Sequence, residues 1–338
     1  MTTIHDVARR ARVSIAAVSL AMNDAGTNRV SASKKKLILE VARETGYRPS
    51  GVAKALSEGN THILGLVVPM RAQIFFNHFI VEVLAGIQAC LLERKYHLMI
   101  YSHSTSRGGI TQGEMAQSRY ADGVIVLNTR LSSAQDMLDT IQSLRNASIP
   151  FVMVNGRPAA EDIPYVGVEE YEVGRLAGDY LIGEGHRRIA MLGGAMRSPG
   201  GQVALQGLTD ACREKKLPGK YPLHEYTEFE RGRIGQTVTE WMKGKYPPTV
   251  IFCDDQMAPE VYEACGALGL SIPKDVAVLG RGDLALGAKM IPKLTTIRVP
   301  AMEIGRLAAE MLIDQVEQPQ AAIRQVLLPC SVTVRESV

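Results

Sequence analysis

Residues Ile4 to Asn23 read IHDVARRARVSIAAVSLAMN. Four apolar residues in its first half share one face of a helix, because they recur at i, i+3, i+4 and i+7: Ile4, Val7, Ala8 and Ala11. After a break at Arg12, Ser14 stands at an N-cap position, where its side-chain oxygen can accept a free backbone N–H. The pattern predicts two short helices joined by a tight turn, the second running from about Ile15 to Met22.

The two predicted helices have the character of a helix-turn-helix unit. Three basic residues of the first helix fall outside its apolar row: Arg9, Arg10 and Arg12. Three residues of the second helix are placed to pack back on the first: Val18, Ala21 and Met22. Its other residues then lie nearer the outside: Ile15, Ala16, Ala17 and Leu20. Small residues at the contact allow the close approach that such a unit needs. The alternative is an ordinary amphipathic helical hairpin with a basic outer face.

The pattern Ile-x-Asp-Val-Ala-x-x-Ala-x-Val-Ser-x-x-x-Val-Ser-x-x-x-Asn resembles the DNA-reading unit of the lactose-repressor (LacI/GalR) family of bacterial transcription regulators. The resemblance implies that one set of residues contacts DNA: Ile4, Ser14, Ile15, Ala16, Ala17, Ser19, Leu20 and Asn23. Ile15, Ala16 and Leu20 stand where relatives often carry polar readers. Apolar side chains can meet thymine methyls but cannot form bidentate bonds to guanine or adenine. We therefore expect modest base discrimination and a strong dependence on phosphate contacts and salt.

A third helix is predicted over residues 31–46, capped by Ser31 or Ser33 and ended by Gly46. Four apolar residues are expected to close the small core: Leu37, Ile38, Val41 and Ala42. Lys34 and the two lysines after it lie in the first turn, where the helix dipole disfavours cations. Phosphate contact explains them better than helix stability does, and the alternative is a solvated face.

Residues 49–61 are predicted to form a hinge. Pro49 starts and Ser50 can cap a helix of barely two turns, which is marginal in isolation and folds only when docked. In the family that the chain resembles, the hinge helix pairs with its dimer mate in the minor groove and wedges a leucine into the central base step. By position that leucine is Leu56, and Lys54 is the neighbouring basic residue.

Length, charge and cysteine usage narrow the function classes. A chain of 338 residues predicts two or three domains. Residues 1–62 hold ten Lys and Arg against five Asp and Glu, a charge of +5 that leaves −2 for the rest and indicates a nucleic-acid partner at one end. The five scattered cysteines indicate buried thiols and no disulfide set or zinc site. No signal core and no run of about 18 apolar residues is present, so a cytoplasmic, nucleoid-associated protein without membrane contact is expected.

Beyond residue 62, apolar strand patterns alternate with helical periods, which predicts parallel sheets covered by helices on both faces. Phrases such as Gly185-His-Arg-Arg-Ile-Ala190 and Leu294-Thr-Thr-Ile297 extend the resemblance over essentially the whole chain. The expected fold is an all-α helix-turn-helix headpiece (1–48), a hinge helix and linker (49–61), and an α/β two-lobed periplasmic-binding-protein-like core (62–338). Lobe 1 is expected at about 62–161 and 293–325, and lobe 2 at about 162–292 and 326–338.

A cleft between two such lobes is the usual place for a small ligand, because strand C-termini and helix N-termini converge there. The candidate effector-binding residues follow the strands: Gln73, Phe76, Arg197, Ser198, Asp254 and Asp283. Phe76 could stack on a sugar face or belong to the core. Asp255 is expected to cap the next helix, which makes Asp254, in place of the family's ligand-binding Asn, the better ligand candidate.

The loop Gly280-Arg-Gly-Asp283 departs from the family's Gly-aromatic-Asp-Asp, with Arg281 in place of the aromatic residue and Gly282 in place of one carboxylate. This departure leaves Asp283 open as a contact and predicts an effector other than an ordinary hexose.

Enzyme signatures are lacking in the sequence: it has no helix-opening Gly-x-Gly-x-x-Gly, P-loop, Gly-x-Ser-x-Gly or His pair at zinc spacing. No catalytic residue, metal or cofactor is therefore expected. The sequence predicts a ligand-responsive regulator, most simply a repressor of a carbohydrate or related catabolic operon, that binds a pseudo-palindromic double-stranded operator as a homodimer. The alternative is a solute-binding or enzymatic α/β protein with an incidental helical N-terminus.

Overall fold

The structure is a computed structural model, and it describes residues 2–22, 30–48, 59–69, 78–103, 120–128, 134–156, 160–196, 198–219 and 222–338. Its contacts divide the chain into two units, Met1–His62 and Ile63–Val338. The first unit is the headpiece and the second is the core. The predicted hinge helix, with Lys54 and Leu56, lies outside the described residues.

The headpiece contains three helices, α1 (Ile4–Ala11), α2 (Ile15–Met22) and α3 (Ala32–Glu44). Its core comes from all three: Val7, Ala8, Ala11, Val18, Ala21, Ile38 and Ala42. The predicted apolar faces of α1 and α2 are confirmed. Leu37 was expected in this core but is 45% exposed. Ile38 and Ala42 take the inward face of α3, and Leu37, one position earlier, is turned about 100° around the helix axis.

The core holds two six-stranded sheets. The first sheet has the order β11-β5-β4-β3-β1-β2, with strands β1 (Ile63–Pro69), β2 (His97–His103), β3 (Gly123–Leu127), β4 (Phe151–Val154), β5 (Tyr165–Gly167) and β11 (Gln325–Leu327). The second has the order β12-β10-β9-β8-β6-β7, with strands β6 (Ile189–Gly193), β7 (Leu223–Tyr226), β8 (Val250–Phe252), β9 (Ala277–Gly282), β10 (Thr295–Arg298) and β12 (Ser331–Thr333). All neighbours are parallel except β10 and β12.

Sheet membership differs from the expected lobe boundaries at two strands. β5 belongs to the first sheet, because it pairs with β4 and β11. β10 belongs to the second sheet, because it pairs with β9 and β12. The strand β7 was not expected at all, since its sequence Leu-His-Glu-Tyr lacks an apolar run and its burial is partial, as suits an edge strand.

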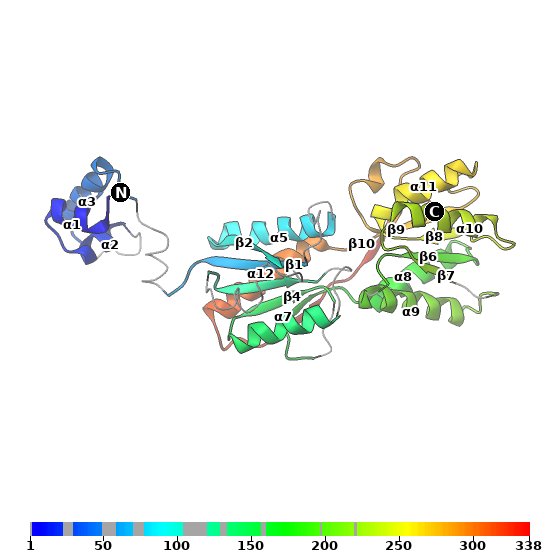
Figure 1. Cartoon of the computed structure of the whole chain (residues 1–338), viewed down its shortest axis with the longest axis horizontal. Coiled ribbons are helices and arrows are strands. Elements are labelled where there is room, and N and C mark those ends of the chain that lie inside the picture. The colour runs from blue at the N-terminus through cyan, green and yellow to red at the C-terminus, as the bar shows by residue number, and fades with distance from the viewer. Residues whose placement is uncertain are drawn as a thin grey trace. The chain divides into compact units, whose positions relative to one another are not determined.

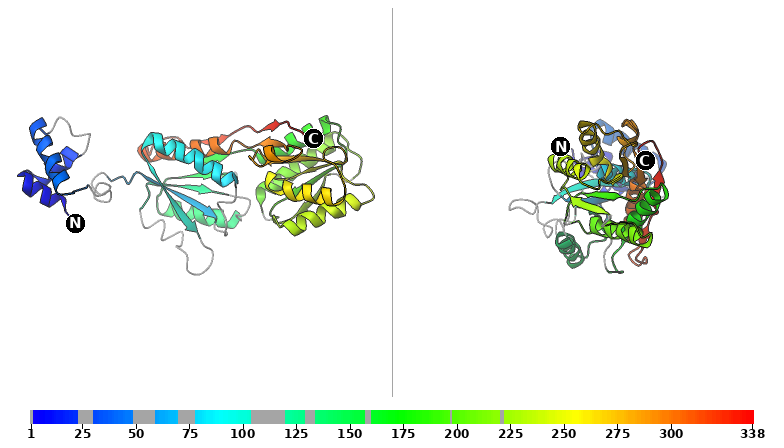
Figure 2. Two further views of the ribbon diagram at one scale, coloured as in Figure 1. Left: turned by 90° about the horizontal axis from the view of Figure 1, so that it is seen from above. Right: turned by 90° about the vertical axis from the view of Figure 1, so that its right-hand side faces the viewer.

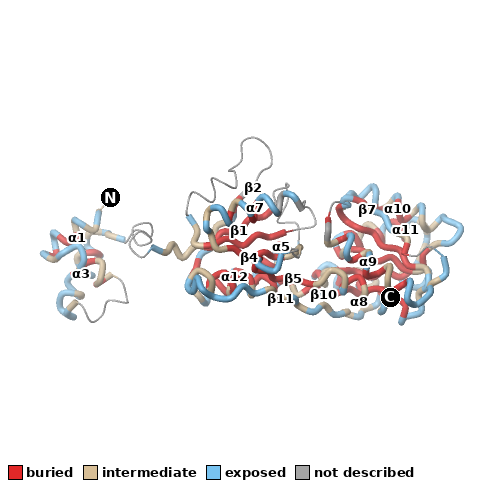
Figure 3. Tube along the Cα trace, turned by 90° about the horizontal axis from the view of Figure 1, so that it is seen from below, coloured by how far each residue is buried: buried red, intermediate tan, exposed pale blue. Residues whose placement is uncertain are grey.

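Helices cover both faces of each sheet (Figures 1 and 2). On the first sheet, α5 (His78–Arg94) and α12 (Ala301–Glu317) pack on one face and α7 (Ala134–Asn146) on the other. On the second, α8 (Glu170–Gly183) and α9 (Pro199–Glu214) pack on one face, and α10 (Arg231–Lys243) and α11 (Ala258–Ala267) on the other. Short 3-10 turns are formed by η3 (Asp255–Met257) and η4 (Gly287–Lys289). Figure 3 shows the buried strands inside both lobes and exposed residues along the helices.

Two helix pairs depend on glycine for their close approach. A Cβ on Gly86 of α5 would lie 1.8 Å from the carbonyl oxygen of Met302 in α12. A Cβ on Gly174 of α8 would lie 1.9 Å from the carbonyl oxygen of Ala204 in α9. The same device therefore holds a helix pair together in each lobe.

The chain passes between the sheets three times, after β5, after β10 and after β11. These crossings bring the end of β5 and the start of α8, and the end of β10 and the start of α12, to the boundary between the lobes. The predicted fold class, a helical headpiece followed by a two-lobed parallel α/β core, is confirmed. Any ligand site at that boundary would be built from residues far apart in the chain.

Candidate functional site

The outer face of α2 is the first candidate surface. Ser14 caps this helix as predicted, because its Oγ accepts the Ala17 N–H at 3.1 Å. Ile15 is 42% exposed, and Ala16 is exposed beside it. Leu20 is half-buried. The sequence of this face presents small and apolar side chains, which suits contact with the floor of a groove.

Two residues expected at the DNA contact have a second role. Ile4 and Ala17 are half-buried and pack against the headpiece core. Ser19 is also half-buried. Lys34 is exposed on the first turn of α3, as a phosphate contact requires. Asn23 lies outside the described residues.

The start of α1 carries a feature that sequence reasoning missed. The Thr3 and Asp6 side chains form a reciprocal capping box with each other's backbone N–H. Asp6 accepts from the Thr3 backbone and hydroxyl, and these hydrogen bonds lower the pKa of its carboxyl group. The signal was present as Thr-x-x-Asp before an apolar helical period.

The second candidate site is the carboxyl edge of the second sheet, where β8 and β9 end and α8 and α9 begin. Four of the six expected effector residues belong to the second lobe: Arg197, Ser198, Asp254 and Asp283. Ser198, Asp254 and Asp283 are described, whereas Arg197 is not. The first-lobe candidates, Gln73 and Phe76, also lie outside the described residues.

Asp255 organises this edge from inside the protein. It is fully buried, and its carboxylate accepts the Thr296 hydroxyl at 2.6 Å and the Leu284 N–H at 2.7 Å. Burial raises its pKa to about 6, although these two hydrogen bonds act in the opposite direction. A Cβ on Gly280 would lie 2.1 Å from Asp255 Oδ1, so this glycine leaves the space that the carboxylate occupies.

The expectation that Asp255 caps the next helix is wrong. Asp255 starts the turn η3, and Met257 holds the N-cap position of α11 without a side-chain cap. Its carboxylate instead accepts hydrogen bonds from Thr296 in β10 and from Leu284 after β9, both distant in sequence. Asp254 precedes it at a half-buried position and is the N-cap residue of η3.

Ser198 and Asp283 both have structural partners. Ser198 is 3% exposed and caps α9, its Oγ accepting the Gly201 N–H at 3.4 Å. Asp283 has a positive φ of 59° and forms an ion pair with Arg335 at 2.5 Å. It also accepts the Thr333 hydroxyl at 3.2 Å. Asp283 therefore ties the end of β9 to the C-terminal strand, whatever else it contacts.

A buried ion pair lies at the same edge. Arg281 Nη2 of β9 donates to Glu170 Oε1 of α8 at 2.7 Å, and the two side chains are only 7% and 14% exposed. The sequence drew attention to Arg281 as a departure from the family pattern, but Glu170 carried no signal. The two residues are 111 positions apart, so only the fold brings them together.

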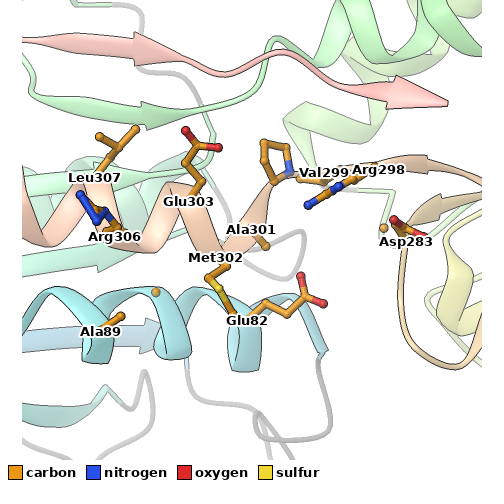
Figure 4. A pocket seen from close by; sticks show the side chains of 13 residues that line it. Glu82, Ala89, Asp283, Arg298, Val299, Ala301, Met302, Glu303, Arg306 and Leu307 are labelled. Atoms are coloured by element: carbon orange, nitrogen blue, oxygen red, sulfur yellow. The ribbon is translucent and has the colours of Figure 1, made fainter. Parts of the chain in front are cut away.

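A cavity of about 790 Å³ lies where the two lobes adjoin, a volume in the range of ligand pockets. Its walls come from α5, from the first half of α12, and from the ends of β9 and β10 (Figure 4). Charged residues among its walls are Glu82, Asp283, Arg298, Glu303 and Arg306. Burial raises the pKa of Glu82, and the negative charge of Asp283 raises it further.

Among the described ranges, no group of three or more His, Cys, Asp or Glu residues is arranged to hold a metal ion. Within the same residues, no helix is both long and apolar enough to cross a membrane. The five cysteines are free thiols, four of them buried. Burial raises the pKa of Cys212 and of Cys265 to about 11, which keeps these thiols protonated at neutral pH.

Two known families match separate parts of the chain, one in the headpiece and one in the core. Residues 3–50 match the family described as bacterial regulatory proteins, lacI family. Residues 179–338 match the family described as periplasmic binding protein-like domain. The first match covers the three headpiece helices, and the second covers most of the second lobe with the returning segment.

Similar proteins match over nearly the whole length. The ribose operon repressor of Escherichia coli (strain K12) is 30% identical over 324 residues, which cover 94% of this chain and 94% of the relative. The HTH-type transcriptional repressor PurR of Vibrio vulnificus (strain CMCP6) is 28% identical over 345 residues, covering 100% and 99%. The solved structure of a complex of the transcriptional regulator CelR with cellobiose is 26% identical, with a TM-score of 0.72 and coverage of 100% of both chains.

Proposed function

The chain belongs to the lacI family of bacterial regulatory proteins and is a ligand-responsive, DNA-binding transcriptional regulator; we propose that it represses a carbohydrate or related catabolic operon from a pseudo-palindromic operator, which it binds as a homodimer. The single observation that carries this proposal is the joining of a capped helix-turn-helix headpiece to a two-lobed α/β core in one chain. One part can read DNA, and the other can sense a small molecule. An enzymatic role has no sequence signature in its favour, and the relatives are named as repressors.

Two-fold symmetry of the DNA site follows from the size of the reading unit. One headpiece reads few base pairs, and dimeric helix-turn-helix proteins bind two half-sites about 10 bp apart or multiples of this spacing. Footprinting of the full chain on genomic fragments should reveal a symmetric protected site. Light scattering should give the mass of a dimer. A monomer mass with an asymmetric footprint would refute this part of the proposal.

Base recognition is assigned to Ile15, Ala16 and Leu20 on the outer face of α2. The proposal is supported by the exposure of Ile15 and Ala16 on this face of α2. Leu20→Ala should reduce the ratio of operator to random-DNA affinity, with affinity for random DNA unchanged. Leu39→Ala, which truncates a 43% exposed leucine on α3, is the matched control. An unchanged ratio in Leu20→Ala would remove Leu20 from the site.

Phosphate contacts are assigned to Lys34 and Lys54, and Ser14, Ser19 and Asn23 are proposed to approach the backbone beside them. Lys34→Ala should weaken binding to all sequences alike and reduce the salt slope by about one unit. Binding isotherms at several salt concentrations measure both quantities. A loss confined to the operator would instead assign Lys34 to base recognition.

The hinge is proposed to couple the core to the DNA. Leu56 packs against its dimer mate and opens the central base step, so that DNA bending improves the phosphate contacts elsewhere. Leu56→Ala should therefore lower operator affinity and leave ligand binding by the core intact. Binding isotherms with operator measure the affinity for DNA, and thermal shifts with effector separately measure ligand binding by the core. Full operator affinity in Leu56→Ala would refute this role.

The effector is proposed to bind at the carboxyl edge of the second sheet, with Asp254 as its principal contact. Support comes from the half-buried position of Asp254 next to the buried Asp255 network. Gln73, Phe76, Arg197, Ser198 and Asp283 remain further candidates for effector contact. Thermal-shift screening of the full chain against sugars, polyols, sugar acids and nucleosides identifies the ligand class.

Action on DNA also places the protein on the nucleoid in this proposal.

A further inference from the structure

The ion pair between Glu170 and Arg281 lies at the carboxyl edge of the second sheet, where the effector is proposed to bind. Glu170 is the first residue of α8, and Arg281 is next to last in β9. Both side chains are more than four-fifths buried. A buried guanidinium needs a negative partner, since removing one member of such a pair leaves an uncompensated charge in a low dielectric. The chain supplies this partner itself.

The carboxylate of Glu170 also lies beside two helix N-termini. It belongs to the first turn of α8, where a negative charge interacts favourably with the helix dipole. It also lies next to the first turn of α9, because a Cβ on Gly200 would be 3.2 Å from Glu170 Cδ. Helix N-termini together with an arginine form a ready anion site. Glu170 therefore occupies the position that the anionic group of a ligand would take.

Arg281 retains unused donor capacity at this position. Its Nη1 is buried and finds no hydrogen-bond acceptor within the part of the chain that the structure describes. A guanidinium has five N–H donors, and an unsatisfied buried donor is unfavourable unless a ligand supplies the acceptor. This nitrogen is an independent sign that a ligand atom completes the site.

The other charges at this edge disfavour a second anion. Asp254 and Asp255 follow β8, and Asp283 follows β9, where Arg335 neutralises it. The Arg281 charge is likewise matched by Glu170. An additional carboxylate or phosphate would add negative charge near Asp254, while Arg281 and Arg335 each already face a carboxylate. A neutral oxygen could accept a hydrogen bond from Arg281 Nη1 without adding charge.

We propose that Glu170 is a built-in counter-ion that restricts the effector to neutral, hydroxyl-rich molecules, with Arg281 Nη1 donating to an uncharged oxygen of the ligand. The proposal rests on the proposed effector site at this edge. It assigns Glu170 as the residue that excludes sugar acids and sugar phosphates. It also assigns Arg281, which replaces an aromatic residue of the family pattern, as a polar contact instead of a stacking surface.

The test removes the internal anion and offers an external one. Glu170→Gln keeps the shape of the side chain and leaves Arg281 and the helix N-termini without a counter-ion. Inorganic phosphate, compared with chloride at equal ionic strength, should then stabilise Glu170→Gln in thermal-shift experiments and bind at least about tenfold more tightly than to the unchanged protein. The gain should vanish in the double variant Glu170→Gln/Arg281→Gln. Glu172→Gln, which changes an exposed carboxylate in the same helix turn, should behave like the unchanged protein.

The unchanged protein provides a second arm that does not depend on the folding of Glu170→Gln. Aldoses are compared with their aldonic acids and phosphates, and no acid or phosphate should stabilise the chain. Stabilisation of the unchanged protein by an acid or phosphate would overturn the proposal. A folded Glu170→Gln without a gain in phosphate binding would also overturn it. Operator binding is measured separately, so failure here and failure of the proposed function are distinguishable.

Discussion

Asp255→Asn should remove a decrease in the free energy of unfolding of the second lobe that occurs as pH rises. Asp255 is fully buried, and desolvation of the carboxylate raises its pKa from 3.8 to about 6. The hydrogen bonds from Thr296 and Leu284 lower this pKa, and the charges of Asp254 and Asp283 raise it. The difference of about two pKa units corresponds to about 3 kcal/mol at about 1.4 kcal/mol per unit.

The sign follows from proton binding. Between the unfolded and the folded pKa, the folded state binds more protons than the unfolded state, so the free energy of unfolding decreases as pH rises. The Asp255 contribution is fully present below about pH 3.8 and is lost as pH rises through about 6. In Asp255→Asn this loss is absent. The stability of the variant relative to the unchanged protein should therefore increase by about 2–3 kcal/mol between about pH 3.5 and pH 7.5.

The single tryptophan of the chain reports on unfolding of the second lobe. Trp241 is the only tryptophan of the chain and packs against the cluster of the second lobe that contains Cys253 and Met257. Urea unfolding followed by its fluorescence at several pH values gives the free energy of unfolding for both proteins. Glu172→Gln, an exposed carboxylate in the same lobe, is the control. A difference between Asp255→Asn and the unchanged protein that stays constant with pH would refute the reasoning.

Four further substitutions test other parts of the fold and site. Gly174→Ala should destabilise the second lobe by about 1–3 kcal/mol in the same urea assay, because its Cβ would lie 1.9 Å from the Ala204 carbonyl oxygen. A Cβ on Gly235 of α10 would have no neighbour within 4 Å, so Gly235→Ala should be neutral or stabilising. Equal destabilisation by Gly174→Ala and Gly235→Ala would contradict the role of close helix approach. Ser14→Ala should weaken α2 by about 1 kcal/mol, seen as faster hydrogen exchange in that helix. Asp254→Ala should abolish the response to effector while operator affinity stays unchanged, and a normal response would exclude Asp254 from the site.

Elements with strong local periodicity could be predicted from the sequence. The i, i+3, i+4, i+7 row before Arg12, together with Ser14 as a cap, predicted α1 and α2 with the correct buried faces. Alternation of apolar runs and helical periods predicted the parallel α/β core, because strand and helix patterns depend on neighbouring residues only. The polar edge strand β7 escaped prediction, since an edge strand is stabilised by its partner β6 and needs no apolar run.

The tertiary structure alone decided which distant residues meet. The short strands β5 and β10 have no local property that assigns them to a sheet, and their partners β4 and β9 settle the matter. The sequence around Asp255 predicts a helix cap, yet its carboxylate accepts hydrogen bonds from Thr296 and Leu284. Glu170 meets Arg281 across 111 residues. Burial and pairing of charges depend on the packing of the whole chain, and no window of the sequence contains that information.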